Sequence, residues 1–168
     1  MKRQDRLLIL ARIAVVAGIY FVATYFLPGL SYGQIQFRVS EGMTVLPLIF
    51  PEAVWGMTLG CLISNVFSPY GWLDMVLGTA ATLIGGLATL FLGKILKNNC
   101  LRPFVSMIPT IVANAFLLPV VWLLSGTEEG YFILAASTLV SETISIYLVG
   151  MPLYYTVIRI TRAGRFKN

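Results

Sequence analysis

Histidine is absent from this sequence of 168 residues, and charged residues make up only 11% of it. Without histidine, the chain lacks the side chain that most often acts as a general base and as a metal ligand. Its cysteines and acidic residues do not have the spacing of a metal site, and no glycine-rich loop ends in Lys-Ser or Lys-Thr, as an ATP-binding loop would. The sequence therefore predicts no catalytic residue, no metal and no cofactor, and it argues against an enzyme.

Cysteine is scarce as well. Cys61 lies within an apolar stretch and Cys100 in a basic loop, which does not fit a disulfide framework. Hydrophobic residues, in contrast, make up 58% of the chain, and the mean hydropathy is +0.84. A water-soluble domain needs more polar surface than this composition supplies. We therefore expect an integral membrane protein, and we interpret its net charge of +5 as a sign of topology rather than of nucleic-acid binding.

Six apolar segments follow one another along the chain, although the second and third are shorter than the roughly 20 residues of a full span. They are 7–26, 41–50, 53–67, 73–96, 103–124 and 131–158. The first follows a basic N-terminus, as in a signal peptide, but no small-residue cleavage site comes after it, so we expect it to be retained. The sequence predicts an all-α membrane protein with six transmembrane helices, forming one integral membrane domain over residues 1–168.

The second and third segments are expected to form a tight helical hairpin that turns at Phe50 and Pro51. Proline suits the first turn of a helix because its missing N–H group would have no intrahelical partner there. Pro51 is therefore predicted to start the third helix, with Glu52 complementing the positive end of the helix dipole.

Basic residues gather before the first segment, between the fourth and fifth, and after the sixth. With six spans, all three clusters fall on one side of the membrane, and the positive-inside rule predicts that this side, with both termini, is cytoplasmic. The clusters are Lys2, Arg3 and Arg6; Lys94, Lys97 and Arg102; and Arg159, Arg162, Arg165 and Lys167. The loops expected on the opposite side carry almost no lysine or arginine apart from Arg38.

Two helices carry small residues along one face, which lets helix backbones approach closely in lipid. In the first segment these residues are Ala11, Ala14 and Gly18, and either a partner protein or the rest of the bundle could cover them. In the fourth segment they are Gly78, Thr82, Gly85, Thr89 and Gly93, for which we expect packing inside the bundle.

Polar side chains at membrane depth are costly and normally face a cavity or a partner. Glu142 and Asn114 are expected at similar depths, about 16 Å and about 15 Å from the outer ends of their helices at 1.5 Å per residue. Together with the outer ends of the second and third segments, they predict a polar pocket that opens away from the cytoplasm and suits a small, flat, polar ligand. The candidate binding residues are Glu142, Glu41, Arg38, Asn114, Asn65, Gln36, Phe37 and Trp72.

Structural roles remain open for several of these residues. Glu142 could be a hydrogen-bonded structural carboxylate paired with Arg38, and Asn114 could join two helices. Trp72 could be an interfacial anchor. Asp74 is expected to be a helix N-cap rather than a ligand.

The segment Ile35-Gln36-Phe37-Arg38-Val39-Ser40-Glu41, followed by Thr44-Val45-Leu46-Pro47, resembles the QueT family of substrate-binding (S) components of energy-coupling-factor transporters. The stretches at 60–65 and 78–83 and Glu142 fit the same pattern, so the resemblance covers nearly the whole chain. It departs at Ser141, where glycine is expected before the glutamate. The resemblance implies a six-helix S-component fold in a bacterial plasma membrane, energised by a transmembrane coupling protein and two cytoplasmic ATPases. Ala11, Ala14 and Gly18 resemble the face that such components present to the coupling protein.

The family is associated with queuosine precursors, which are 7-deazaguanines such as the 7-aminomethyl and 7-cyano compounds, or queuine. A deazaguanine offers N1–H and N2–H₂ as adjacent donors, which one carboxylate, Glu142 or Glu41, could accept as a bidentate pair. Arg38, Asn114 or Asn65 could donate to O6, and an aromatic side chain could stack on the base. The alternatives are an S component for another vitamin or nucleobase, a membrane scaffold protein that binds no ligand, and an intramembrane enzyme.

Overall fold

The structure, a computed structural model, describes residues 3–27 and 37–165, and within them every regular element is helical. Four of the segments each consist of one helix: the α-helices α1 (Arg3–Tyr25), α3 (Ala53–Asn65) and α7 (Tyr131–Arg165), and the 3₁₀-helix η1 (Val39–Leu48). The π-helical turn η2 (Asp74–Gly78) continues into α4 (Thr79–Ile95), and the short α5 (Arg102–Val105) precedes α6 (Ile108–Leu124). These elements correspond to the six segments predicted from hydropathy.

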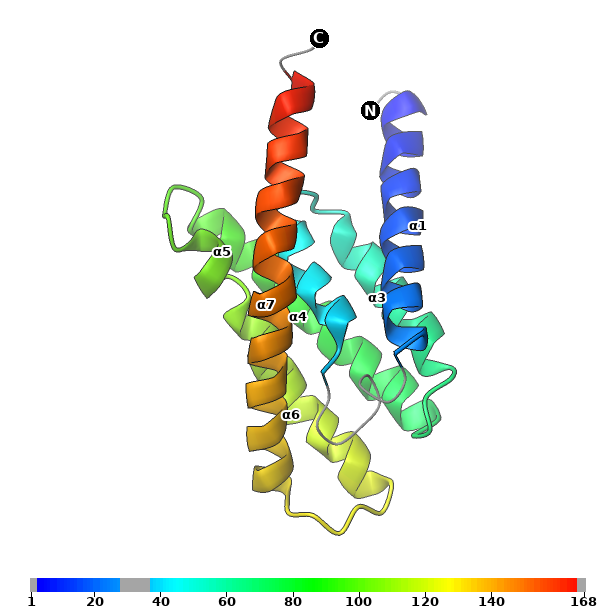
Figure 1. The fold of residues 1–168 in the computed structure, drawn as a ribbon. Helices are drawn as coiled ribbons and strands as arrows, with labels where there is room; N and C mark the ends of the chain where they lie inside the picture. The colour runs from blue at the N-terminus through cyan, green and yellow to red at the C-terminus, as the bar shows by residue number, and fades with distance from the viewer. Residues whose placement is uncertain (1–2, 28–36, 166–168) are drawn as a thin grey trace.

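The six segments alternate in direction, so the N- and C-termini lie at the same end of the bundle (Figure 1). We call this end the termini end and the opposite one the far end. The turn between η1 and α3 and the loop between α4 and α5 are at the termini end, while the α3–η2 and α6–α7 connections are at the far end (Figure 1). The predicted gathering of the basic clusters at one end is thereby confirmed for the α4–α5 connection, which contains Lys97 and is flanked by Lys94 and Arg102.

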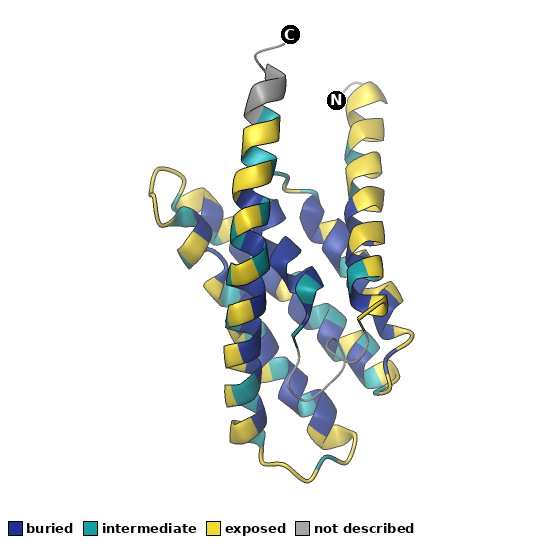
Figure 2. Ribbon diagram, in the orientation of Figure 1, coloured by how far each residue is buried: buried dark blue, intermediate teal, exposed yellow. Residues whose placement is uncertain are grey.

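The outer surface of the bundle is nonpolar. Large hydrophobic side chains are exposed along α1, α3, α4, α6 and α7. Figure 2 shows that exposed positions run along α1 and α7. Four stretches are long and apolar enough to cross a membrane: Arg3–Tyr25, Asp74–Ile95, Arg102–Leu124 and Tyr131–Thr161. A soluble protein does not expose so much contiguous nonpolar surface, so the chain is a multi-pass membrane protein.

The predicted hairpin between the second and third segments is present, but α3 begins at Ala53 and not at Pro51. A tight turn comes first, in which the amide groups of Ala53 and Val54 bond to the carbonyls of Phe50 and Pro51 three residues earlier. Glu52 precedes the helix and makes no capping bond with its side chain, which instead accepts a 2.8 Å hydrogen bond from Arg12 on α1.

The small residues of α4 pack inside the bundle, as predicted. Gly85 lies against Thr110 of α6, where an added Cβ atom would be 2.7 Å from Thr110 Oγ1, and Thr89 shares a 3.1 Å hydrogen bond with the same hydroxyl. Glycines of α3 allow a similar approach to α1: a Cβ atom on Gly60 would lie 2.7 Å from the carbonyl oxygen of Ala17. These contacts hold α1, α3, α4 and α6 at short range.

Candidate functional site

A group of buried polar side chains lies in the half of the bundle toward the far end, where α1, η1, α3, η2, α4, α6 and α7 converge. Each of these side chains is at most 3% exposed, and every one of these elements contributes at least one of them. We call this group the polar cluster: Tyr20, Arg38, Glu41, Cys61, Asn65, Asp74, Thr82, Asn114 and Glu142. Burial of so many polar groups is costly unless they bind one another or a ligand.

Arg38 and Glu41 form one side of the polar cluster, at the start of η1. Arg38 Nη1 lies 3.9 Å from Glu41 Oε1, and the hydroxyl of Tyr20 on α1 donates a short hydrogen bond to the same oxygen. A second link between the two elements is the 2.7 Å hydrogen bond between Thr24 and Ser40. These bonds fix the start of η1 against α1 and hold the Glu41 carboxylate in place.

Cys61 lies at the centre of the polar cluster, and its sulfur accepts hydrogen bonds from three side chains. Thr82 Oγ1 is 3.2 Å from its sulfur, Asn65 Nδ2 is 3.4 Å away, and Arg38 Nη1 is 3.9 Å away. Sulfur is a weak acceptor, so these donors are held in place without being strongly engaged. Asn65 and Thr82 also donate to backbone carbonyls, those of Asp74 and Gly78 at 2.8 and 3.1 Å.

The π-helical turn at the start of the fourth segment brings Asp74 into the polar cluster. Asn65 Nδ2 donates to the carbonyl oxygen of Asp74 over 2.8 Å, and both side chains lie above Gly78, whose added Cβ atom would be 2.6 Å from Asp74 Oδ1. The prediction that Asp74 is a helix N-cap is wrong: the helix has already begun at Trp72, and the Asp74 carboxylate is buried and makes no capping bond. Single π-turns within helices are frequent at functional sites.

Glu142 of α7 and Asn114 of α6 form the side of the polar cluster opposite Arg38 and Glu41. Their predicted similarity in depth is confirmed, since the Asn114 side chain lies beside the Glu142 carboxylate, although not in hydrogen-bond geometry. Glu41 and Arg38 are close enough to Glu142 to interact with it electrostatically. Glu142 is 0% exposed, and neither of its oxygens has a hydrogen-bond partner among the described residues.

Other oxygens of the polar cluster are unpartnered too. Within the described part of the chain, Glu41 Oε2, Asn65 Oδ1 and Asp74 Oδ2 are buried and accept no hydrogen bond. The polar cluster thus holds three carboxylates and one guanidinium, with several acceptors that meet no donor from residues 3–27 and 37–165. This arrangement suits a ligand that is rich in hydrogen-bond donors and carries no negative charge.

The remaining candidates lie at the edge of the polar cluster or away from it. Phe37 lines a separate groove of about 500 Å³ with Ser141 and other residues of α7, next in sequence to Arg38 and Glu142. Trp72 is 70% exposed at the far end, as an interfacial anchor would be. Gln36 lies outside the described residues.

The polar cluster contains residues that sequence reasoning missed. Tyr20, Cys61 and Thr82 were not candidates, because each has an ordinary role in a transmembrane helix and only helix rotation places it inside. One usable signal was present: Asn65, Asp74 and Thr82 are polar and come from two consecutive segments that must pack together across a short connection.

The small-residue face of α1 lies on the surface. Ala11, Ala14 and Gly18 are exposed, and no atom lies within 4 Å of the position of a Cβ atom on Gly18. Val16, Ala17 and Tyr20 on the other side of α1 make the contacts with the bundle. Packing within the bundle therefore does not account for this face.

Comparison with known proteins identifies a transporter family. The sequence profile described as QueT transporter matches residues 10–159. The chain is also 41% identical over 75 residues to the queuosine precursor transporter QueT of Lactococcus lactis subsp. cremoris (strain MG1363). That alignment spans 43% of each chain, less than half of the relative's length. No solved structure matches the chain.

The family match extends from the first half of α1 to the last turns of α7, so it includes every residue of the polar cluster. A transport role in a membrane agrees with the nonpolar outer surface and with the buried polar groups that it encloses. The chain belongs to the QueT transporter family, which implies transport rather than catalysis.

Proposed function

We propose that this chain is the substrate-binding component of an energy-coupling-factor transporter. It would capture a queuosine precursor of the 7-deazaguanine type at the outer face of a bacterial plasma membrane. The observation that carries the proposal is the Glu142 carboxylate. It is fully buried and lies close to Asn114, Arg38 and Glu41, but neither oxygen accepts a hydrogen bond of good geometry from the described residues. The relative from Lactococcus is named for queuosine precursors, which supports this substrate class.

The hydrogen-bonding pattern of a deazaguanine complements the polar cluster. Its N1–H and N2–H₂ donors would meet both oxygens of Glu142 in a bidentate pair. Its O6 acceptor would take a donor from Asn114 or Arg38, and the remaining edge would be within reach of Asn65. Phe37, which follows the undescribed segment and precedes Arg38, is our candidate for stacking on the flat base.

The charge of the polar cluster favours a cationic precursor. When ionised, Glu41, Asp74 and Glu142 would carry three negative charges against the one positive charge of Arg38, and all four side chains are buried. An aminomethyl group, which is protonated at neutral pH, would offset part of this excess in a low-dielectric setting. We propose that Glu41 would receive it; one of its oxygens is unpartnered among the described residues, while the other accepts a hydrogen bond from Tyr20.

Transport would require a transmembrane coupling protein and two cytoplasmic ATPases, because the sequence has no ATP-binding loop of its own. The exposed face of Ala11, Ala14 and Gly18 would contact the coupling protein, since small residues let another helix approach closely. The termini end would face the cytoplasm, which places the polar cluster in the outer half of the membrane.

The proposal is tested by calorimetry on the purified chain in detergent, with 7-aminomethyl-7-deazaguanine, 7-cyano-7-deazaguanine, queuine, guanine and riboflavin. Saturable binding of a deazaguanine, strongest for the aminomethyl compound, is expected, with no binding of riboflavin. Tight binding of a ligand without the guanine-type edge would favour an S component for another vitamin. A folded protein that binds none of them would favour the scaffold alternative.

The coupling role is tested separately by uptake in cells that contain the energising module. Ala14→Trp should leave ligand binding by the purified protein unchanged but abolish uptake, because the large ring prevents close helix contact. Leu87→Trp, on the exposed surface of α4, is the matched control and should retain uptake. Normal uptake by the Ala14 variant would remove this face from the proposed interface.

A further inference from the structure

A second cavity system lies at the termini end, away from the polar cluster. An apolar groove of about 390 Å³ runs between α1, η1 and α7, and a basic pocket of about 850 Å³ adjoins it. The two share Arg12 and Phe50 as lining residues, so they form one continuous surface feature. Neither contains a residue of the polar cluster.

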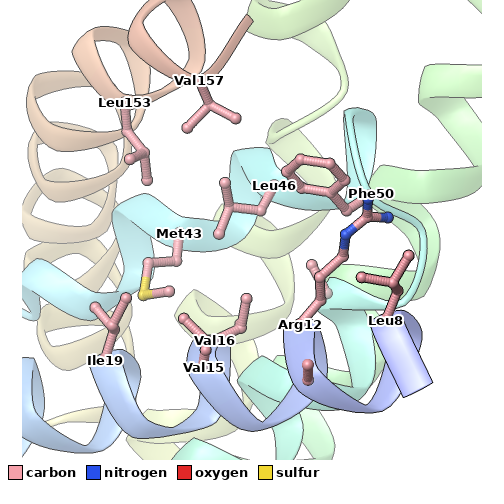
Figure 3. A pocket seen from close by; sticks show the side chains of 12 residues that line it. Leu8, Arg12, Val15, Val16, Ile19, Met43, Leu46, Phe50, Leu153 and Val157 are labelled. Carbon is pink, nitrogen blue, oxygen red and sulfur yellow. The ribbon is translucent and has the colours of Figure 1, made fainter. Parts of the chain in front are cut away.

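The apolar groove exists because η1 is short. At about 2 Å per residue, a 3₁₀-helix of this length covers only about two thirds of the hydrocarbon core, and it leaves α1 and α7 apart at the termini end (Figure 1). Figure 3 shows Val15, Val16 and Ile19 of α1 on one side, with Leu153 and Val157 of α7 on the other. Met43 and Leu46 of η1 form the floor. Every side chain that lines the groove except Arg12 is nonpolar, so the groove suits a hydrocarbon chain.

The basic pocket carries an excess of positive charge. Arg12, Lys97 and Arg102 line it, and Glu52 is the acidic side chain that pairs with Arg12 at 2.8 Å, so these four groups sum to a formal charge of +2. Arg102 is fixed by hydrogen bonds of 2.8 and 2.9 Å to the carbonyls of Gly93 and Leu48, which position its guanidinium without neutralising it. Arg12 is held over the ring of Phe50, 4.7 Å from its centroid (Figure 3).

We propose that this groove and pocket bind one anionic phospholipid, with an acyl chain between α1 and α7 and the phosphate headgroup among Arg12, Lys97 and Arg102. The amphipathic shape supports a lipid, because the hydrocarbon and anionic ends of one molecule match the two parts of the cavity. Basic pockets between transmembrane helices at the cytoplasmic side are known lipid headgroup sites, and the termini end has the charge of that side. Of the small-residue face of α1, Ala11 alone lines the groove, so the lipid would border that face.

The proposal is tested by native mass spectrometry of the full chain, purified in mild detergent and equilibrated with equal amounts of phosphatidylglycerol and phosphatidylcholine of identical acyl chains. A pocket of charge +2 should favour the phosphatidylglycerol adduct by on the order of 25-fold, at about fivefold per charge. Lys97→Gln should lower this preference about fivefold. Lys94→Gln, a matched change on the same helix end that does not line the pocket, should leave it unchanged.

Two further arms separate a lipid from other occupants. Val157→Trp, which fills the groove, should reduce the adducts of both lipids, and glycerophosphoglycerol, which has the headgroup without chains, should not compete. Full competition by that headgroup would mean a simple anion site and would overturn the proposal. Equal retention of both lipids, or equal effects of the Lys94 and Lys97 substitutions, would overturn it as well and would leave the groove to a helix of a partner protein.

Discussion

Four charged side chains are buried among the residues that the structure describes, and three of them are carboxylates. Burial of unpaired charge in a membrane protein is expensive, so such groups are retained where they bind something. Arg38 partly offsets Glu41, but Glu142 and Asp74 keep oxygens without donors. We interpret this imbalance as the feature that selects a ligand with several donors and, ideally, a positive charge.

The role of Glu41 leads to a prediction about selectivity. Glu41→Gln should weaken binding of 7-aminomethyl-7-deazaguanine by about tenfold or more, since a hydrogen bond to a charged group contributes about 1.5–3 kcal/mol. Binding of the neutral 7-cyano compound should change much less. Calorimetry with both ligands measures the difference, with Glu128→Gln in the exposed α6–α7 loop as the control. Equal losses for the two ligands would mean that Glu41 does not meet the 7-substituent.

Gly78 gives a second prediction at the same scale. In Gly78→Ala, the new methyl group would lie 2.6 Å from Asp74 Oδ1 and 2.9 Å from Asn65 Nδ2, so both side chains must move. Ligand affinity should fall about tenfold, as expected when a buried hydrogen bond to a charged group is lost. Gly18→Ala, where nothing lies within 4 Å, is the matched control and should bind normally. Unchanged affinity in the Gly78 variant would place Asp74 and Asn65 outside the ligand contacts.

Residue roles were only partly predictable from the sequence. Glu142, Asn114, Arg38, Glu41 and Asn65 are polar groups at membrane depth, and the structure brings all five together because depth can be counted along a helix. Residue spacing does not show which side of each helix faces the interior of the bundle. Cys61 and Tyr20 therefore gave no signal, and Asp74 was mistaken for a cap because a π-turn within the helix has no sequence signature.

At the scale of elements, two departures from regular α-helix shape the molecule. The 3₁₀ winding of η1 extends over ten residues, from Val39 to Leu48, although such runs seldom exceed three or four. Its start supplies Arg38 and Glu41 to the polar cluster, and its short reach opens the apolar groove at the termini end. The π-turn η2 then directs Asp74 inward. Both irregular elements border the proposed ligand site, and neither was predicted.

The contact between α1 and α3 depends on a glycine, and adding a methyl group at that glycine tests how close the contact is. In Gly56→Ala, the added Cβ atom would be 2.7 Å from Val16 Cβ and 2.9 Å from the Ile13 carbonyl oxygen, where backbone cannot yield easily. We expect a loss of about 1–3 kcal/mol of stability, as for other overpacked sites, seen as a lower melting temperature in detergent. Gly86→Ala meets its nearest atoms at 3.4 Å and should not lower it. Equal melting temperatures would contradict this close packing.

The number and order of elements followed from hydropathy, because each nonpolar stretch must be covered by lipid or by another helix. The predicted segments 53–67 and 103–124 have C-terminal ends within about two residues of the C-terminal ends of α3 and α6. The start of α3 was placed too early, because Pro51 belongs to a tight turn that precedes the helix. Helix ends depend on such local hydrogen bonds, which composition does not record.

For the molecule as a whole, the central prediction about topology is that the termini end faces the cytoplasm. The native cysteines test it without engineered sites, because Cys100 is exposed in the α4–α5 loop while Cys61 is buried in the polar cluster. A membrane-impermeant maleimide should label Cys100 in inside-out vesicles but not in intact cells. Cys100→Ser should abolish the labelling, which shows that it reports on that residue. Labelling of Cys100 in intact cells would reverse the proposed orientation and place the polar cluster in the inner half of the membrane.

The account depends most on a ligand that binds the polar cluster through Glu142. The most direct measurement is calorimetric titration of 7-aminomethyl-7-deazaguanine into the wild-type protein, Glu142→Gln and Glu128→Gln. We predict saturable binding by the wild type and by the Glu128 variant, with a loss of about 10-fold to 100-fold in Glu142→Gln, as expected for a charged bidentate pair. Binding by a folded Glu142 variant within twofold of the wild type would contradict the account.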